Sequence, residues 1–206
     1  ALVISSKVFW PTMSGPNGRG LSRKHIMESI NASLRRLDTD YLDLYFCQRY
    51  DPDTPLEEVT RAMDDLIHQG KILYWGTSEW EAAQIAQAWV TSRQFNHIPQ
   101  SMEQPQYNLF HRDRVENDLA PLCKEYGIGL TTWSPLYFGI LSGKYNDGIP
   151  AGSRAAMDDK VWIRDEITPD RIAIVRRLTE LAQELSITTA QLAIAWILRR
   201  KEVSSV

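Results

Sequence analysis

Lys7 is the first residue of the chain whose type and position suit chemistry, because it follows the apolar run Ala1-Leu-Val-Ile-Ser-Ser. A lysine at the end of a buried strand can act as a general acid, form a Schiff base as a nucleophile, or lower the pKa of a neighbouring group through its charge. A solvated lysine at the end of a strand would give the same pattern. The pattern alone leaves these interpretations of Lys7 open.

Polar residues also follow several later apolar, strand-like runs. They are Gln48-Arg49 after Tyr41–Cys47, Ser78-Glu79 after the run from Ile72, Gln104 after the run from Ile98, and Ser134 after the run from Ile128. Where parallel strands alternate with helices, the carboxyl ends of the strands meet at one rim. The sequence therefore predicts that these residues line one pocket together with Lys7.

The residues around Gln48 suggest contact with a substrate oxygen. Gln48 can donate to and accept from a carbonyl group, but it cannot titrate. The plainer alternative is a turn with a surface pair between Arg49 and Asp51. Asp43 lies inside the same run, where an unpaired buried carboxylate is costly, so we expect it to pair with a basic group. One candidate for that partner is Lys7 on the preceding strand.

Two later groups of residues suit a nucleotide cofactor. Ser78, Glu79 and Gln104 offer the donors and acceptors that the amide of a nicotinamide needs, although each alone is also typical of a polar turn. The segment Trp133-Ser134-Pro135-Leu136 is followed by Gly139, Lys144 and Ser153-Arg154. Backbone N–H groups, hydroxyls and two cations suit a pyrophosphate and an extra phosphate. A plain basic loop is the alternative.

The elements that must position these residues are read from periodicity. Strands are predicted at 2–8, 41–47, 72–76, 98–103 and 128–133, with a last one from Val203. Amphipathic stretches predict helices between them, capped by Ser22, by a capping box at Thr54-Pro55-Leu56-Glu57 and by Thr168-Pro169. Further helices are predicted at 81–93, 115–126 and 189–199. Among the buried stripes that the spacing assigns are Ile26, Ile30, Leu34 and Leu37, and Ile174, Leu178, Leu181 and Leu185.

This alternation predicts an α/β fold of parallel units with right-handed crossovers. Doubly wound sheets and closed eight-fold barrels share the pattern. The chain has no G-x-G-x-x-G after a strand and no G-x-x-x-x-G-K-[ST], which disfavours a dinucleotide-binding doubly wound sheet. The long irregular stretches at 9–20 and 142–167 are predicted to be binding loops or lids.

Composition excludes several function classes. A net charge of -3 over 206 residues argues against a nucleic-acid-binding surface. No apolar run is long enough to predict a membrane span. The histidines do not have the spacing of metal ligands. The chain also contains no G-x-S-x-G motif, which would have predicted a serine nucleophile. Cys47 and Cys123 lie far apart in apolar surroundings, which predicts two buried reduced thiols in a cytosolic protein rather than a disulfide.

An ordered series of motifs resembles the aldo-keto reductases, in particular the branch that contains the voltage-gated potassium channel beta subunits. The motifs run through the chain as Gly20-Leu-Ser-Arg-Lys-His25, Ser33-Leu-Arg-Arg-Leu37, Tyr41-Leu-Asp43-Leu, Asp51-Pro-Asp-Thr-Pro55, Tyr74-Trp-Gly-Thr-Ser78, Glu103-Gln104, Thr132-Trp-Ser-Pro-Leu136, Ser142-Gly-Lys-Tyr145 and Ala190-Gln-Leu-Ala-Ile-Ala-Trp196. The resemblance implies a single (β/α)8 TIM-barrel domain over 1–206 that binds NADP(H) and reduces an aldehyde or ketone by hydride transfer.

The resemblance also assigns roles. Lys7 matches the lysine that assists a proton-donating tyrosine, and Gln48 stands where most members have a histidine and channel beta subunits tend to have asparagine. The matching cofactor residues are Ser78, Glu79 and Gln104 at the nicotinamide, Trp133, Ser134, Pro135, Leu136, Tyr137 and Phe138 at the pyrophosphate, and Lys144 and Arg154 near the adenosine phosphates.

The family's catalytic tyrosine and aspartate match no position in this sequence. We therefore expect an incomplete barrel, with the first two βα units and the C-terminal segment absent, that is inactive by itself. The implied partner is a small carbonyl substrate. The alternative is a cytoplasmic regulatory subunit that forms a homo-tetramer, docks on a membrane channel and uses bound NADP(H) as a redox sensor. A sugar-phosphate barrel with Lys7 as a Schiff-base nucleophile is a third interpretation, which the motifs disfavour.

Overall fold

The computed structural model describes residues 2–206, which fall into two compact units. The first comprises the residues up to Pro105 together with Asn117–Thr131, and the second comprises Gln106–Glu116 together with Thr132–Val206. The units are described one after the other.

The first unit is built on a parallel sheet whose strands follow one another in chain order. Its strands are β1 (Ser5–Val8), β2 (Leu42–Cys47), β3 (Ile72–Ser78), β4 (Met102–Gln104) and β5 (Gly129–Thr131). Each strand pairs in parallel with the next. The predicted strands are confirmed in place and order, although β1, β4 and β5 are shorter than predicted.

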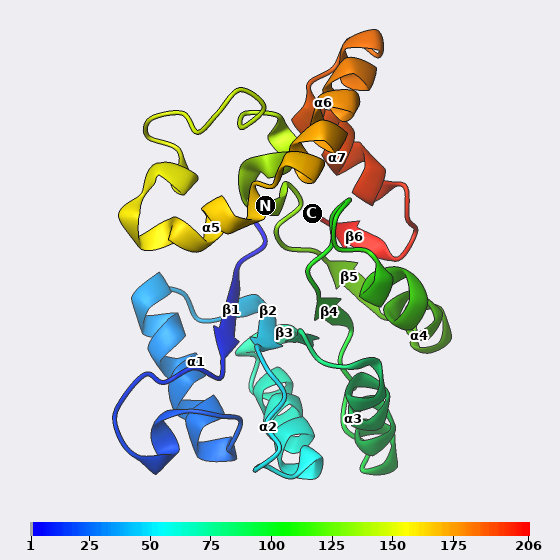
Figure 1. Cartoon of the computed structure of the whole chain (residues 1–206). Helices are drawn as coiled ribbons and strands as arrows, with labels where there is room; N and C mark the ends of the chain where they lie inside the picture. Colours follow the sequence, from blue (N-terminus) through cyan, green and yellow to red (C-terminus); the bar gives the residue numbers. More distant parts are fainter. Residues whose placement is uncertain (1) are drawn as a thin grey trace. The chain divides into compact units, whose positions relative to one another are not determined.

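Helices connect these strands and lie on the same side of the sheet (Figure 1). They are α1 (Arg23–Leu37), α2 (Leu56–His68), α3 (Ala82–Gln94) and α4 (Ala120–Tyr126), and each contacts the next one along the chain. A doubly wound sheet would reverse its strand order and place helices on both faces. Sequential strands with helices on one face are the arrangement of a β/α-barrel wall, so the unit fits a (β/α)8-type fold.

The helix starts follow the sequence signals, with one exception. Ser22 caps α1 by accepting a hydrogen bond from the His25 N–H at 3.2 Å. The capping box predicted at Thr54 is wrong, because α2 begins at Leu56 with Pro55 at the N-cap position and has no side-chain cap; the Thr54 hydroxyl donates to Asp51 at 2.8 Å. A capping box does form at Glu81 with Gln84, at the start of α3.

The core of this unit contains Ile26, Ile30 and Leu34 of the predicted α1 stripe. Leu37 was expected in the same stripe, but it is 47% exposed. It is the last residue of α1, and the chain turns at Asp38 into a left-handed conformation with φ 51°. Cys47 and Cys123 are both buried and form no disulfide within the described residues, as predicted.

The second unit is mostly helical. It contains the short helices η3 (Tyr137–Ser142), η4 (Arg154–Ala156) and η5 (Asp158–Lys160), the helices α5 (Val161–Glu166), α6 (Pro169–Glu184) and α7 (Thr189–Leu198), and the strand β6 (Val203–Ser205). Two further elements are η1 (Pro16–Gly18), in the first unit, and the π-helical η2 (Arg114–Leu119), which precedes α4. Within the second unit, the Thr132 N–H donates to the Ser205 carbonyl at 3.0 Å.

Three of the four residues in the buried stripe predicted for α6 are exposed, while the fourth, Leu178, packs against the core of the unit. Ile174, Leu181 and Leu185 are 48%, 43% and 55% exposed, while Val175 and Ala182, one position further along, are buried. Among the described residues, only a narrow side of α6 packs against the rest of its unit, so most of the apolar stripe is left uncovered.

The core of the second unit surrounds the segment that follows Trp133. Its buried members are Tyr137, Ile140, Leu141, Tyr145, Ala155, Ile163, Val175 and Ala193. Within residues 2–206, no single helix is long and apolar enough to cross a membrane, although α6 and α7, bent by 91° at their junction, reach that length together.

Candidate functional site

Lys7 and Gln48 lie at the carboxyl ends of the neighbouring strands β1 and β2. Lys7 pairs with Phe46 in the parallel register, and the Gln48 N–H donates to the Val8 carbonyl at 3.0 Å. The Lys7 ammonium lies 4.8 Å from the centroid of the Phe46 ring. Burial lowers the pKa of Lys7. Since the group has no carboxylate partner among the described residues, its charge is available to a group bound at this rim.

Asp43 does not pair with Lys7, and that expectation is corrected. Its carboxylate accepts a hydrogen bond from the Ile4 N–H at 2.8 Å. The register explains the difference, because Asp43 stands near the amino end of β2 while Lys7 stands at the carboxyl end of β1. A backbone N–H supplies the partner that the half-buried carboxylate needs.

Ser78 and Gln104 are register partners at the ends of β3 and β4. The Ser78 hydroxyl donates to the Gln104 backbone carbonyl at 3.0 Å, which leaves the hydroxyl oxygen able to accept. Among residues 2–206, no side-chain hydrogen bond engages the Gln104 amide. Glu79 follows in a left-handed conformation with φ 59°, so the chain turns sharply after Ser78. The pair can offer both an acceptor and a donor to an amide.

Asp51 has a structural role that the sequence reasoning missed. It is not in a surface pair with Arg49, as the plainer alternative proposed. Its carboxylate accepts from the Leu21 N–H at 2.6 Å, the Thr54 hydroxyl and the Asp53 N–H. It thereby ties the loop after β1 to the loop after β2. The Asp-x-x-Thr spacing, which is typical of a local turn held by an aspartate, is the signal that could have revealed it.

Arg49 and Trp10 lie together on these two loops. The Arg49 guanidinium lies 5.8 Å from the centroid of the Trp10 ring and donates to the Gln48 carbonyl at 2.6 Å. Trp10 is 52% exposed. The rim at Lys7 therefore has an aromatic side chain on its flanking loop.

The second unit carries the remaining predicted cofactor residues on an unusual backbone. Ser134, Tyr137 and Phe138 have φ values of 56°, 45° and 59°. Each such conformation in a residue other than glycine costs about 1–3 kcal/mol, and such strain gathers at functional sites. The Asn108 amide and the Tyr137 N–H both donate to the Ser134 carbonyl, at 3.0 Å each, and hold the turn between Trp133 and Leu136.

Lys144 and Arg154 supply the positive charges of this unit. The Lys144 side chain crosses Gly139, where a Cβ would lie 2.5 Å from Cε and 2.7 Å from Nζ. Its ammonium lies 5.1 Å from the centroid of the Tyr145 ring. Arg154 is the first residue of η4. Both side chains are exposed, and neither has a carboxylate partner in the described part of the chain, so both fit a role in binding phosphate.

The side chains of Tyr137 and Phe138 are engaged within the second unit. The Tyr137 hydroxyl donates to Glu166 at 2.6 Å, and Phe138 makes an edge contact with Trp162 at 4.7 Å between centroids. Any contact of these two residues with a cofactor would therefore come mainly from their backbone. Glu166 has no sequence motif that would have singled it out.

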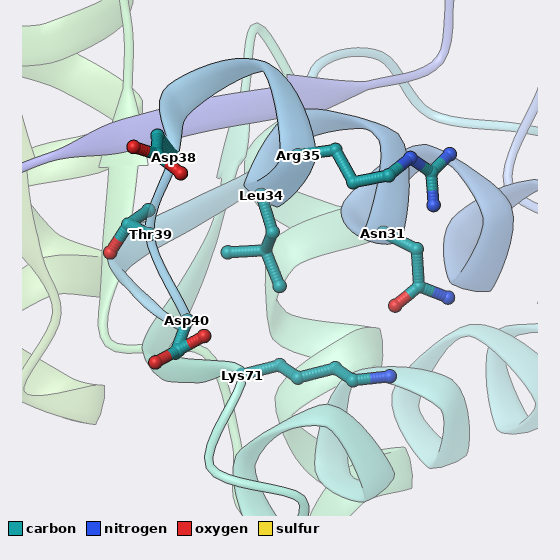
Figure 2. Close-up of a pocket in the computed structure, with 7 residues that line it drawn as sticks. All are labelled: Asn31, Leu34, Arg35, Asp38, Thr39, Asp40 and Lys71. Atoms are coloured by element: carbon teal, nitrogen blue, oxygen red, sulfur yellow. The ribbon is translucent and has the colours of Figure 1, made fainter.

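The pocket in Figure 2 lies away from the strand ends that carry Lys7 and Gln48. It has a volume of about 570 Å³ and is lined by Asn31, Leu34, Arg35, Asp38, Thr39, Asp40 and Lys71. These residues come from the end of α1 and from the positions just before β2 and β3, which is the amino-terminal edge of the sheet. Its two cations are matched by two carboxylates, so it has no net preference for an anionic cofactor.

Comparisons with known proteins agree with the motif series. The model of the aldo/keto reductase family matches residues 1–206. The chain is 49% identical over 207 residues to a probable voltage-gated potassium channel subunit beta from Arabidopsis thaliana and 48% identical to one from Oryza sativa. These alignments cover 100% of this chain and 63% of each relative. The resemblance stated from the motifs is confirmed, and this chain belongs to the aldo/keto reductase family.

Proposed function

We propose that this chain carries part of the active site of an NADP(H)-dependent reductase acting on small aldehydes or ketones, built on a (β/α)8 barrel. The observation that supports this most is that Lys7 and Gln48 stand at the carboxyl ends of the neighbouring strands β1 and β2, while Ser78 and Gln104 stand at the ends of β3 and β4. Bound NADPH would supply the hydride. The residues of this chain would bind the cofactor, orient the carbonyl and assist the proton transfer.

Lys7 would act through its charge. A positive ammonium next to a phenol stabilises the phenolate and lowers the energy needed to transfer the phenolic proton. In the family, a tyrosine donates that proton to the developing alkoxide. Gln48 would donate its amide N–H to the same oxygen, orienting the carbonyl without a change of charge.

The remaining residues would bind the cofactor. Ser78 and Gln104 would contact the amide of the nicotinamide, with Glu79 at the turn that follows. In the second unit, the backbone from Trp133 to Phe138 would bind the pyrophosphate. Lys144 and Arg154 would neutralise the adenosine phosphates, since charge-assisted bonds to phosphate are stronger than neutral ones.

The test compares Lys7→Met with Lys71→Met in the full-length protein. NADPH oxidation with 4-nitrobenzaldehyde is followed at saturating cofactor. Loss of the Lys7 charge should lower kcat about a hundredfold or more, as expected for impaired proton transfer. Lys71 lies at the opposite edge of the sheet, so its substitution should leave kcat unchanged. Equal activity of the two variants would contradict the assigned role of Lys7.

The dependence on pH gives a second test of the same residue. Burial lowers the pKa of Lys7, so the ammonium is lost at a lower pH than that of a free lysine. Because the charged form assists catalysis, kcat should fall as pH rises through this lowered pKa. In Lys7→Met this alkaline limb should disappear. If kcat still falls at alkaline pH in the variant, the titration belongs to a group other than Lys7.

A second function is supported by the relatives named as channel beta subunits. In that case the protein would be cytoplasmic, peripheral at a membrane through a channel partner, and assembled as a homo-tetramer with NADP(H) as redox sensor. Gln48 in place of the usual histidine favours slow turnover. Co-purification with the channel, measured beside steady-state reduction, separates the two functions. A stable channel complex with negligible turnover would favour the regulatory one.

A further inference from the structure

Tyr137, Glu166 and Arg171 form a cluster that joins three segments of the second unit. The Tyr137 hydroxyl donates to Glu166 Oε2 at 2.6 Å. Arg171 forms an ion pair with the same carboxylate and also donates to the Glu166 backbone carbonyl at 3.0 Å. Burial raises the pKa of Tyr137 to about 12, while the hydrogen bond from Tyr137 lowers the pKa of Glu166. The phenol is therefore neutral and the carboxylate charged at neutral pH. We call these three residues the Glu166 latch.

The latch and an aromatic contact hold α5 at both ends. Glu166 is the last residue of α5, and Trp162, near its start, makes the edge contact with Phe138. The Arg171 guanidinium also lies 5.1 Å from the centroid of the Tyr137 ring. The strained segment at Tyr137 and Phe138 is therefore fastened to α5.

Helix α5 in turn holds the segment that carries Arg154. Arg164 of α5 donates to the Ala155 carbonyl at 2.6 Å and to the Met157 carbonyl at 3.4 Å. Ile163 and Ala155 are both fully buried in the core of the second unit. A continuous series of contacts thus runs from the latch through α5 to η4, whose first residue is Arg154.

We propose that Tyr137, Glu166 and Arg171 are positioning residues that fix Arg154 for the extra phosphate of NADP(H), and thereby set the preference for NADPH over NADH. This inference rests on the proposed function and deepens it. Arg154 is exposed and has no carboxylate partner among residues 2–206, so its backbone must be held if it is to bind without a large loss of entropy. The latch supplies that restraint from a distance.

The direction in which NADPH affinity changes distinguishes this positioning role from a direct electrostatic effect of Glu166 on the cofactor. Glu166 is negative, and removing a negative charge from a phosphate-binding unit should strengthen NADPH binding through reduced repulsion. The latch predicts the opposite result. Loss of the Glu166 charge loosens α5 and η4, so NADPH binding weakens while NADH, which lacks the extra phosphate, is little affected.

The experiment measures both affinities by fluorescence titration of full-length Glu166→Gln. We expect NADPH to bind about tenfold more weakly, the effect of losing one well-placed charged contact. NADH binding should stay within about twofold. Glu180→Gln, an exposed glutamate on α6, is the matched control and should behave as wild type. Unchanged or tighter NADPH binding, or equal weakening of both cofactors, overturns the proposal.

A double variant tests whether the latch acts through Arg154. Arg154→Ala should weaken NADPH binding by itself, and adding Glu166→Gln should cause little further loss if the two residues share one effect. Fully additive losses would show that Glu166 acts independently. Tyr137→Phe should reproduce part of the effect, with Tyr41→Phe, on the loop before β2, as its control.

Hydrogen exchange tests the latch without any cofactor. The Ala156 and Met157 N–H groups donate to the Ser153 and Arg154 carbonyls, at 3.0 and 3.2 Å, and should exchange faster in Glu166→Gln. If the wild-type protein binds neither cofactor, the proposed function fails. The exchange measurement still shows whether the Glu166 latch restrains the segment 153–157. Unchanged exchange across 153–157 would then refute it.

Discussion

The first and second units place their candidate site residues by different means. In the first unit, Lys7, Gln48, Ser78 and Gln104 stand at strand ends, and the parallel register brings each close to the next. In the second unit, a left-handed turn and side-chain contacts hold the candidate residues, which are those from Trp133 through Phe138 together with Lys144 and Arg154. Regular hydrogen bonding tolerates substitution of many side chains, whereas a turn held by particular contacts does not. Damage to the strand contacts and loops that build the first unit should therefore act mainly on stability, whereas damage to the turn that carries the cofactor residues of the second unit should act mainly on cofactor binding.

The largest effect is expected at the contact between β3 and β4. A Cβ on Gly76 would lie 2.4 Å from the Met102 carbonyl oxygen, so Gly76→Val should force these strands apart. The cost should be about 3 kcal/mol or more of unfolding free energy. Urea denaturation measures it, with Ala83→Val on the exposed side of α3 as control. A loss below about 1 kcal/mol would contradict the close approach of the strands.

Asp51 should give the next largest effect. Asp51→Ala leaves the Leu21 N–H and the Thr54 hydroxyl without their acceptor, which should cost about 2–3 kcal/mol. Asp53→Ala is the control, because the Asp53 side chain makes no hydrogen bond or ion pair within residues 2–206. Limited proteolysis should also cut the loop at 9–20 sooner in the Asp51 variant. Equal denaturation midpoints for the two variants would show that Asp51 does not hold these loops.

Gly139 tests the contrasting behaviour of the second unit. Gly139→Ala should displace Lys144 and weaken NADPH binding about tenfold, the cost of one misplaced cation. Gly148→Ala shares the left-handed strain, with φ 122°, but its Cβ would meet nothing within 4 Å. It should lose stability without losing affinity. If both glycine variants bind NADPH equally, the backbone strain that they share explains any loss of affinity, and the position of Lys144 does not matter for NADPH binding.

The smallest effect is expected on the uncovered side of α6. Leu181→Lys replaces a side chain that is 43% exposed, and the lysine stem can cover the same apolar surface while its ammonium reaches water, so stability should change by about 0.5 kcal/mol or less. Val175→Lys on the buried side should destabilise severely. Thermal unfolding of the two variants compares them directly. A large loss from Leu181→Lys would mean that another surface covers this side of the helix.

Much of the fold could be predicted because the relevant signals are local. Ser22 caps a helix that begins at Arg23, Thr168 caps α6, and Gly127 ends α4 in a left-handed conformation with φ 70°. Apolar runs of strand length placed all the strands of the first unit. The roles assigned to Lys7, Gln48 and the cofactor residues stay predictions, and the structure adds where each of them stands.

The errors share a different physical origin. Thr54 has the sequence of a helix cap, but α2 has Pro55 at the N-cap position, and the Thr54 hydroxyl donates to the Asp51 carboxylate outside the helix. The stripe on α6 has the correct period, yet periodicity gives no information on which side finds a partner. Asp43 was expected to pair with Lys7 because they lie on adjacent strands. The register instead offers it the Ile4 N–H.

The sequence by itself determined the family, the alternation of strands and helices, and the polar residues at the strand ends, because these depend on residue types and short spacings. Only the tertiary structure decided that Asp51 joins two loops, that Lys144 crosses Gly139, and that Glu166 links Tyr137 to Arg171. These contacts join segments that folding alone brings together. The Asp-x-x-Thr spacing indicates the turn at Asp51, but no local pattern encodes the bond from Leu21 to Asp51 or the bond from Tyr137 to Glu166.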